Sequence, residues 1–146
     1  MNLYVLLVTG TRAPLNEVNR RIVQDAIDRH MLAANTVTTL YPRGRTFVLI
    51  EGGADGVDKH ACYWGKIRGT VPGTFAANWD HHRNGAGPIR NGVLLETALG
   101  YAALGHEVHV EAFPGPLVDP KKPGGTRDMM KKVKGRLPLN VTELVL

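Results

Sequence analysis

The chain of 146 residues is poor in cysteine, in aromatic residues and in long apolar runs. Its single cysteine, Cys62, excludes an internal disulfide, so a reducing, cytoplasmic setting is the simplest prediction. The apolar run Leu3–Val8 is too short for the core of a signal peptide and far short of the roughly 20 residues that cross a bilayer. We therefore expect one soluble cytoplasmic domain, residues 1–146, with no membrane contact.

Several motifs for metals, cofactors and nucleophilic catalysis are also missing. The sequence has no GxGxxG fingerprint, no GxxxxGK phosphate loop and no GxSxG nucleophile elbow. Asp80, His81 and His82 are consecutive and lack the spacing of a metal site, and HxxxH, CxxC and HExxH do not occur. We expect neither a metal nor a resident cofactor.

Positive charge is concentrated in one segment near the end of the sequence. The chain carries a net charge of +5, and residues 115–136 alone hold seven cations and two anions. The cations are Lys121, Lys122, Arg127, Lys131, Lys132, Lys134 and Arg136. Such a patch attracts nucleic acid or anionic small ligands, although a solvated lysine-rich helix face is an equally good interpretation.

Apolar patterning predicts alternating strands and helices. Continuous apolar runs favour strands buried on both faces, and three- and four-residue spacing of apolar residues favours helices. The expected strands are 3–8, 46–50, 71–76 (weak), 107–113 and 138–146, and the expected helices are 15–34, 55–67, 87–104 and 126–134. This order predicts an α/β fold, a Rossmann-like three-layer sandwich around a mostly parallel sheet of about five strands.

Glycine-rich segments follow the ends of the expected strands, where the ligands of parallel sheets collect. A lone Gly-Gly turn is more often a tight connection, but four such segments at one edge favour a ligand site for phosphate. The arginines near these glycines either bind phosphate through two guanidinium N–H groups or form surface ion pairs. Trp79 either stacks on a base or fills the core. The expected ligand-binding residues are Gly10, Thr11, Arg12, Gly52, Gly53, Ala54, Asp58, Trp79, Arg90, Asn91, Gly124, Gly125 and Thr126. Asp55 is expected to cap the following helix.

The order of these segments resembles a known family. The segments are Val8–Arg12, Gly52–Ala61 with its GGAxGxD pattern, Asn78-Trp79, the GPxRN element Gly87–Asn91, and Gly125-Thr126. Together they are similar to the YspA-like branch of the SLOG superfamily, which groups the DNA-processing protein DprA (Smf) with the cytokinin-activating LOG enzymes. The resemblance runs from Val5 to Leu139 and implies a Rossmann-like fold that binds nucleotides or nucleotide-derived ligands.

LOG-type members resemble phosphoribohydrolases that use an arginine and the glutamate of a PGGxGTxxE motif. In this chain Met129 stands at the glutamate position, and Asp128 lies one residue earlier, about 100° around a helix. Cleavage of an N-glycosidic bond needs a carboxylate and a clamp on the phosphate. The catalytic candidates are therefore Glu51, at a strand end, together with Arg90 and Asp128.

Three functions follow from these patterns. The first is binding of a nucleotide or nucleotide-derived small molecule by a sensor or sequestering module. The second is hydrolysis of the N-glycosidic bond of a nucleoside monophosphate, and the third is DprA-like binding of single-stranded DNA through the basic segment 121–136. An apolar stripe wider than one sheet contact needs predicts a homodimer or higher homo-oligomer. Its members are Leu94, Leu95, Ala98, Leu99, Ala102, Ala103 and Leu104.

Overall fold

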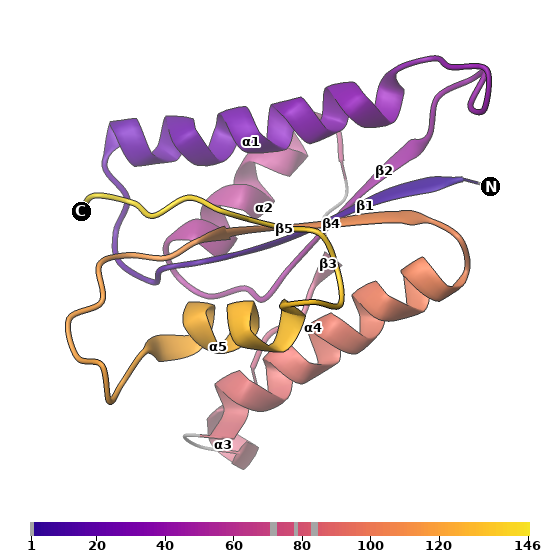
Figure 1. Cartoon of the computed structure of the whole chain (residues 1–146). Helices are drawn as coiled ribbons and strands as arrows, with labels where there is room; N and C mark the ends of the chain where they lie inside the picture. The colour runs from indigo at the N-terminus through magenta and orange to yellow at the C-terminus, as the bar shows by residue number, and fades with distance from the viewer. Residues whose placement is uncertain (1, 71–72, 78, 83–84) are drawn as a thin grey trace.

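Five parallel strands form the sheet of this computed structural model, which describes residues 2–70, 73–77, 79–82 and 85–146 (Figure 1). The strands are β1 (Leu3–Gly10), β2 (Thr46–Glu51), β3 (Gly73–Thr74), β4 (Glu107–Phe113) and β5 (Leu139–Val141), in the order β3-β2-β1-β4-β5. The chain adds β2 and β3 on one side of β1 and then returns to place β4 on the other. The predicted α/β, Rossmann-like fold is confirmed, and its topological switch point lies between β1 and β4.

Helices cover both faces of this sheet (Figure 1). They are α1 (Glu17–Asn35), α2 (Val57–Ile67), α3 (Trp79–His82), α4 (Ala86–Ala103) and α5 (Gly124–Val133). α1 and α2 lie on one face and α4 and α5 on the other, which completes the three layers. The short α3 was not predicted, α5 begins two residues earlier than expected, and the last strand covers three residues of the predicted 138–146. Residues 71–72 of the weak third strand lie outside the described residues.

Alternation along β1 divides the core between the two faces. Leu6 and Val8 pack against α1 and α2, whereas Val5 and Leu7 pack against α4 and α5. Successive side chains of a strand point to opposite faces, so a central strand covered by helices on both sides must be apolar throughout. The continuous apolar run at the start of the sequence therefore places β1 at the centre of the sheet.

The first two helices begin in different ways. α1 has Asn16 as its N-cap, whose side chain accepts a hydrogen bond from the Asn19 amide at 2.8 Å. α2 has Gly56 at this position with a φ of +78°, and no side chain caps it. The prediction that Asp55 caps α2 is wrong, because its carboxylate instead pairs with the exposed Lys59 ammonium at 2.6 Å. An alanine Cβ at Gly56 would collide with the Thr11 carbonyl oxygen, so close packing of this turn against the end of β1 requires glycine.

The apolar stripe of α4 is largely used within the chain. Leu94, Leu95 and Ala98 are buried in the core beneath the sheet, whereas Leu104, directly after the helix, is 76% exposed. None of the helices in the described ranges is long and apolar enough to cross a membrane.

Candidate functional site

A cavity of about 750 Å³ lies at the carboxyl ends of the strands, beside the switch point between β1 and β4. It is bounded by the ends of these two strands and by the beginnings of α2, α4 and α5. Ten of the predicted site residues line it, namely Gly10, Thr11, Arg12, Ala54, Asp58, Arg90, Gly124, Gly125, Thr126 and Asp128. Glu51, Gly52, Gly53 and Asn91 do not line it. The segments singled out in the sequence therefore meet around one hollow.

The glycines of these segments play two different roles. A Cβ at Gly10 would collide with the side chain of Val57, and one at Gly52 would collide with the guanidinium of Arg90. These two glycines are small because protein atoms occupy the space beside them. Cβ atoms at Gly124 and Gly125 would meet nothing within 4 Å. This second pair, at the start of α5, leaves open space that a ligand can enter.

Arg90 and Asn91, at the first turns of α4, join two walls of the cavity. Arg90 is 8% exposed, and its Nη1 donates to the Gly52 carbonyl oxygen at 2.5 Å while its Nε donates to Asn91 Oδ1 at 3.0 Å. The Asn91 amide donates in turn to the Gly125 carbonyl oxygen at 2.9 Å and to Asp128 Oδ2 at 3.0 Å. This chain of hydrogen bonds fixes the loop after β2 and the start of α5 relative to α4, and it leaves a buried cation in the cavity wall.

Asp58 is the buried carboxyl group of the cavity. It is 4% exposed and occupies the first turn of α2. Its Oδ2 accepts a hydrogen bond from the Ala54 amide at 3.3 Å and lies 4.0 Å from Arg90 Nη1. Its Oδ1 is buried and has no hydrogen-bond partner among the described residues. Burial raises the pKa of Asp58 to about 7, against the opposing effects of the Arg90 charge and of the nearby Ala54 and Gly52 amides.

Glu51, at the end of β2, does not line the cavity. It is fully buried, its Oε1 accepts a hydrogen bond from the Thr74 hydroxyl, and its Oε2 accepts one from the Gly53 amide at 2.6 Å. Burial raises the pKa of this carboxyl group, while these two hydrogen bonds oppose the rise. Both oxygens thus serve to join the end of β2 to β3 and to the turn that follows.

Asp128 and Arg127 extend from the first turns of α5. Asp128 lines the cavity and binds the Lys132 ammonium at 2.6 Å as well as the Asn91 amide. Arg127 Nη2 donates to the Gly115 carbonyl oxygen at 2.9 Å, which ties the loop after β4 to α5. Arg12 also lines the cavity, so three arginines approach it from three segments. Met129, at the position of the LOG glutamate, is completely buried in the core.

Two residues singled out in the sequence, Asn78 and Trp79, cannot be placed in the site, and several lining residues were not predicted from the sequence. Trp79 begins α3, but its side chain and the preceding Asn78 lie outside the part that the structure describes. The overlooked lining residues are Pro116 and Val118 after β4, and Leu146 at the end of the sequence. Pro114-Gly115, which also lines the cavity, gave a loop signal at a strand end, whereas nothing in the local sequence placed Leu146 beside Gly115.

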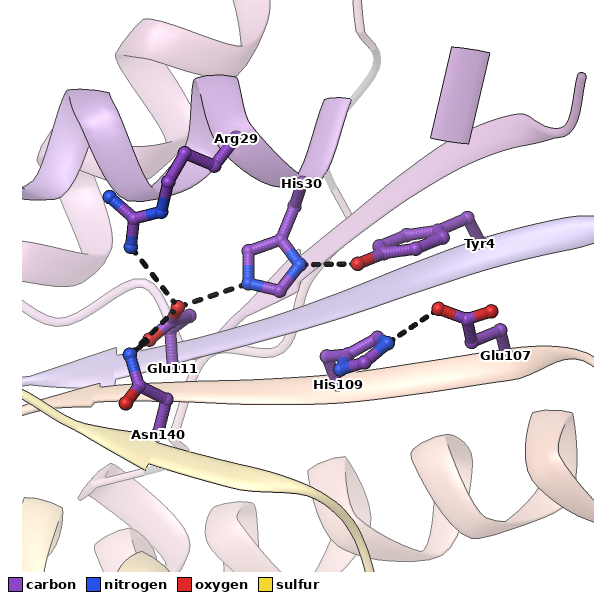
Figure 2. Close-up of polar contacts among 7 residues, drawn as sticks. All are labelled: Tyr4, Arg29, His30, Glu107, His109, Glu111 and Asn140. Atoms are coloured by element: carbon purple, nitrogen blue, oxygen red, sulfur yellow. Dashed lines mark hydrogen bonds and ion pairs between the residues drawn. The ribbon is translucent and has the colours of Figure 1, made fainter. Parts of the chain in front are cut away.

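A second cluster of polar side chains lies on the α1 face of the sheet, along β4 (Figure 2). His30 Nε2 lies 3.0 Å from Glu111 Oε1, and the Tyr4 hydroxyl lies 2.5 Å from His30 Nδ1. Burial, assisted by the charge of Glu107, raises the pKa of Tyr4 to about 12. The Glu111 carboxylate only accepts hydrogen bonds, so Nε2–H of His30 donates to it and Nδ1 accepts from the Tyr4 hydroxyl. The Asn140 amide donates to Glu111 Oε2 at 2.8 Å. Both carboxylate oxygens are therefore satisfied within the protein.

Comparisons with known proteins give one structural similarity. No protein-family model matches the chain, and no curated protein matches it. The chain is similar to the X-ray structure of DNA processing protein A (DprA) from Streptococcus pneumoniae, with a TM-score of 0.46 and 14% sequence identity. The similarity covers 94% of this chain and 58% of that one, so the chain spans little more than half the length of that protein. The fold class itself rests on the strand order and the parallel pairing.

Proposed function

We propose that the cavity binds a nucleotide or a nucleotide-derived small molecule, and that the chain acts as a sensor or sequestering module. The observation that carries this proposal is the meeting of open glycines, arginines and one incompletely paired carboxyl group around a single cavity at the switch point of the sheet. Its volume of about 750 Å³ is typical of small-molecule sites. We also propose that the chain belongs to the SLOG superfamily, in its YspA-like branch.

The start of α5 is the part of the cavity that suits phosphate. No side chain caps this helix, and Gly124 and Gly125 leave space in front of its first turn. Unpaired N–H groups and the helix dipole favour an anion there. Arg12 and Arg90 line the same cavity and add positive charge. Phosphate at this end places the rest of a nucleotide toward the β1 end and Asp58.

A thermal-shift panel tests this proposal. The panel contains nucleoside mono-, di- and triphosphates, NAD, ADP-ribose, cyclic dinucleotides and short single-stranded DNA. A ligand at about 100 times its Kd stabilises the folded chain by roughly 2.7 kcal/mol, which raises Tm by several degrees. We expect one class of nucleotide to give this shift. An unchanged Tm with every small molecule contradicts the proposal.

A matched pair of variants locates the binding. Gly125→Glu places a carboxylate in open space at the start of α5, whereas Gly100→Glu adds the same group to an exposed position of α4 outside the cavity. Neither Cβ meets a neighbour within 4 Å, so both variants are expected to fold. The nucleotide shift should disappear in Gly125→Glu and persist in Gly100→Glu. A shift that persists in both places the ligand elsewhere.

Hydrolysis of the N-glycosidic bond of a nucleoside monophosphate is the alternative, favoured by Arg90 and Asp128 in the same cavity. In this reaction water adds to C1′ of the sugar, the C1′–N bond breaks, and the base leaves with a proton. Glu51, Arg90 and Asp128 remain the candidate residues, and only the last two line the cavity. Release of free base that Asp128→Asn abolishes and Glu51→Gln preserves would establish this alternative with Asp128 as its carboxylate.

Binding of single-stranded DNA is the second alternative, favoured by the exposed cations around the end of α5. Lys131, Lys134 and Arg136 are exposed there, whereas Lys132 is engaged by Asp128. Affinity for DNA should then fall steeply with salt, by nearly one unit of log–log slope for each phosphate contact. A salt slope that is unchanged after Lys131 and Lys134 are replaced by alanine contradicts this alternative.

Self-association through α4 is proposed on the apolar side chains that this helix leaves exposed. Ile89 and Val93 are about half exposed, and Leu104 follows directly after the helix. We expect a dimer or higher homo-oligomer, which light scattering at tens of micromolar measures. A purely monomeric mass, or one that Val93→Glu does not alter, contradicts this mode of association.

A further inference from the structure

The most informative group in the cavity is the carboxyl of Asp58, because its two oxygens have different surroundings. Oδ2 accepts from the Ala54 amide, whereas Oδ1 is buried and unpaired in the described part of the chain. A buried polar atom without a partner destabilises a protein, and such atoms are rare in folded chains. The side chain also lines the ligand cavity. Its missing partner is therefore to be sought in what occupies the cavity.

The nearest cation does not supply that partner. Arg90 Nη1 lies 4.0 Å from Oδ2, beyond hydrogen-bond distance, and it donates to the Gly52 carbonyl oxygen instead. A Cβ at Gly52 would collide with this guanidinium, so the loop after β2 holds Arg90 in place. The Asp58 carboxyl thus remains the only incompletely paired acid among the described side chains that line the cavity, because Asp128 is bound by Lys132 and Asn91.

We propose that Asp58 accepts a hydrogen bond from a neutral donor of the bound nucleotide, a sugar hydroxyl or a base amino group. This inference rests on the proposed function and deepens it, because it assigns the second pole of the ligand. The phosphate lies at the start of α5, and the donor group lies at the start of α2. A ligand that carries only phosphate occupies the start of α5 and leaves the Asp58 carboxyl unpaired.

Proton release on binding follows from the same contact. The charged groups that face Asp58 are Glu51 from β2 and Arg90 from α4, while Arg12 and Asp128 line the cavity from the loop after β1 and from α5. With a pKa of about 7, the free carboxyl is about half protonated at neutral pH. A donor from the ligand stabilises the ionised form, so binding lowers this pKa and expels up to about half a proton at pH 7.

Calorimetric titration of the intact chain tests the contact. The probes are the ribonucleoside monophosphates of adenine, guanine, cytosine and uracil with their 2′-deoxy and 3′-deoxy counterparts, and inosine monophosphate beside adenosine monophosphate. Removal of the donor that Asp58 binds should weaken affinity by about tenfold to a hundredfold. The deoxy probes report on the sugar hydroxyls and the inosine probe on the base amino group.

Asp58→Asn is the decisive variant. It keeps the shape of the side chain and removes the buried charge, so it is expected to fold, and Asp58→Ala serves as a second variant. Both variants should bind the ribonucleotide and its donor-lacking analogue with equal affinity. They should also lose the proton release, which is measured by calorimetry in two buffers of different ionisation enthalpy. Titration of the ligand phosphate is common to all variants and cancels in this comparison.

The outcomes separate this inference from the proposed function. If wild type and Asp58→Asn bind nucleotides with the same relative affinities for all analogues, the Asp58 contact is wrong but the nucleotide site is still supported. Absence of binding by every probe contradicts the proposed function and, with it, this inference. A preference for the donor-bearing probe that disappears in Asp58→Asn supports both.

Discussion

Two carboxyl groups buried in the same chain have opposite surroundings. Glu111, on the α1 face of β4, is 2% exposed and receives hydrogen bonds from His30 and Asn140, with the Arg29 guanidinium 3.7 Å away (Figure 2). Asp58, at the carboxyl edge of the sheet, is buried to the same degree, yet one of its oxygens is unpaired among the described residues. We interpret Glu111 as a group that stabilises the fold, and we propose that Asp58 is kept for a bound ligand.

The location of each group explains this difference. Glu107, His109 and Glu111 alternate along β4 on the α1 face, with Val108 and Val110 facing the opposite core. Side chains from α1 and β5 reach that face and complete the polar network. The carboxyl edge of the sheet is instead closed only by loops and helix starts, which leave a cavity. Burial alone therefore does not distinguish the two groups; we base the proposed site on burial without a partner beside a cavity.

The largest predicted effect concerns the pH dependence of stability at Asp58. Its pKa in the folded chain, about 7, lies above the ordinary value of 3.8, so its contribution to stability is fully present below about pH 4 and is lost as pH rises through 7. Relative to Asp58→Asn, the wild type should lose on the order of 4 kcal/mol of unfolding free energy between these limits. Urea denaturation of both proteins from pH 4 to pH 8 measures this difference. A difference that does not vary with pH contradicts the assignment.

Glu111→Gln should lower the unfolding free energy at pH 7, whereas Asp58→Asn should raise it, and the effect of Glu111→Gln should be the smaller of the two. The amide turns an N–H group toward either His30 or Asn140, both of which donate to the native carboxylate. We expect a loss of about 1–3 kcal/mol in unfolding free energy. Chemical denaturation at pH 7 gives this value, and nucleotide binding should remain at the wild-type level. A gain in stability would place Glu111 in the same class as Asp58.

Asp128→Asn tests a carboxylate that has partners but is only half-buried. Its ion pair with Lys132, four residues along α5, is shared with solvent. The stability loss should be only about 0.3–0.5 kcal/mol, typical of such helix pairs. Thermal denaturation in low and high salt measures it, because added salt should reduce the loss. A loss above 2 kcal/mol would mean that the Asn91 contact makes this group part of the buried framework.

Lys59→Ala should produce the smallest effect. Lys59 pairs with Asp55 on the exposed start of α2, and hydrogen bonding with this ammonium lowers the pKa of Asp55. Exposed pairs of this kind contribute little to stability. Tm and nucleotide affinity should both match wild type within error. A change in affinity alone would extend the binding site beyond the cavity.

The sequence predicted the architecture well because the signals of the main elements are local. The apolar run of β1 and the helical spacing of α1 and α4 can each be read from consecutive residues. The glycine-rich segments were then placed at strand ends because they follow the predicted strands. The four-residue α3 and the two-residue β3 are too short to give a periodic signal. The extent of β5 depends on pairing with β4, which no local pattern records.

The roles of the individual site residues were harder to predict. The pattern placed Glu51 and Asp58 at the same edge of the sheet but could not say which of them has its partners within the protein. That depends on Thr74, which arrives from β3, and on Arg90, which arrives from α4. Similarly, Gly52 and Gly125 look alike in the sequence, and only packing shows that Arg90 fills the space beside one of them.

NMR of the ¹³C-labelled carboxyl group of Asp58 measures its pKa directly, with and without the nucleotide that gives the largest thermal shift. We expect a midpoint near 7 in the free protein and a clear fall when the ligand is bound. A midpoint near the ordinary value for aspartate, or one that a saturating nucleotide leaves unchanged, would contradict this expectation.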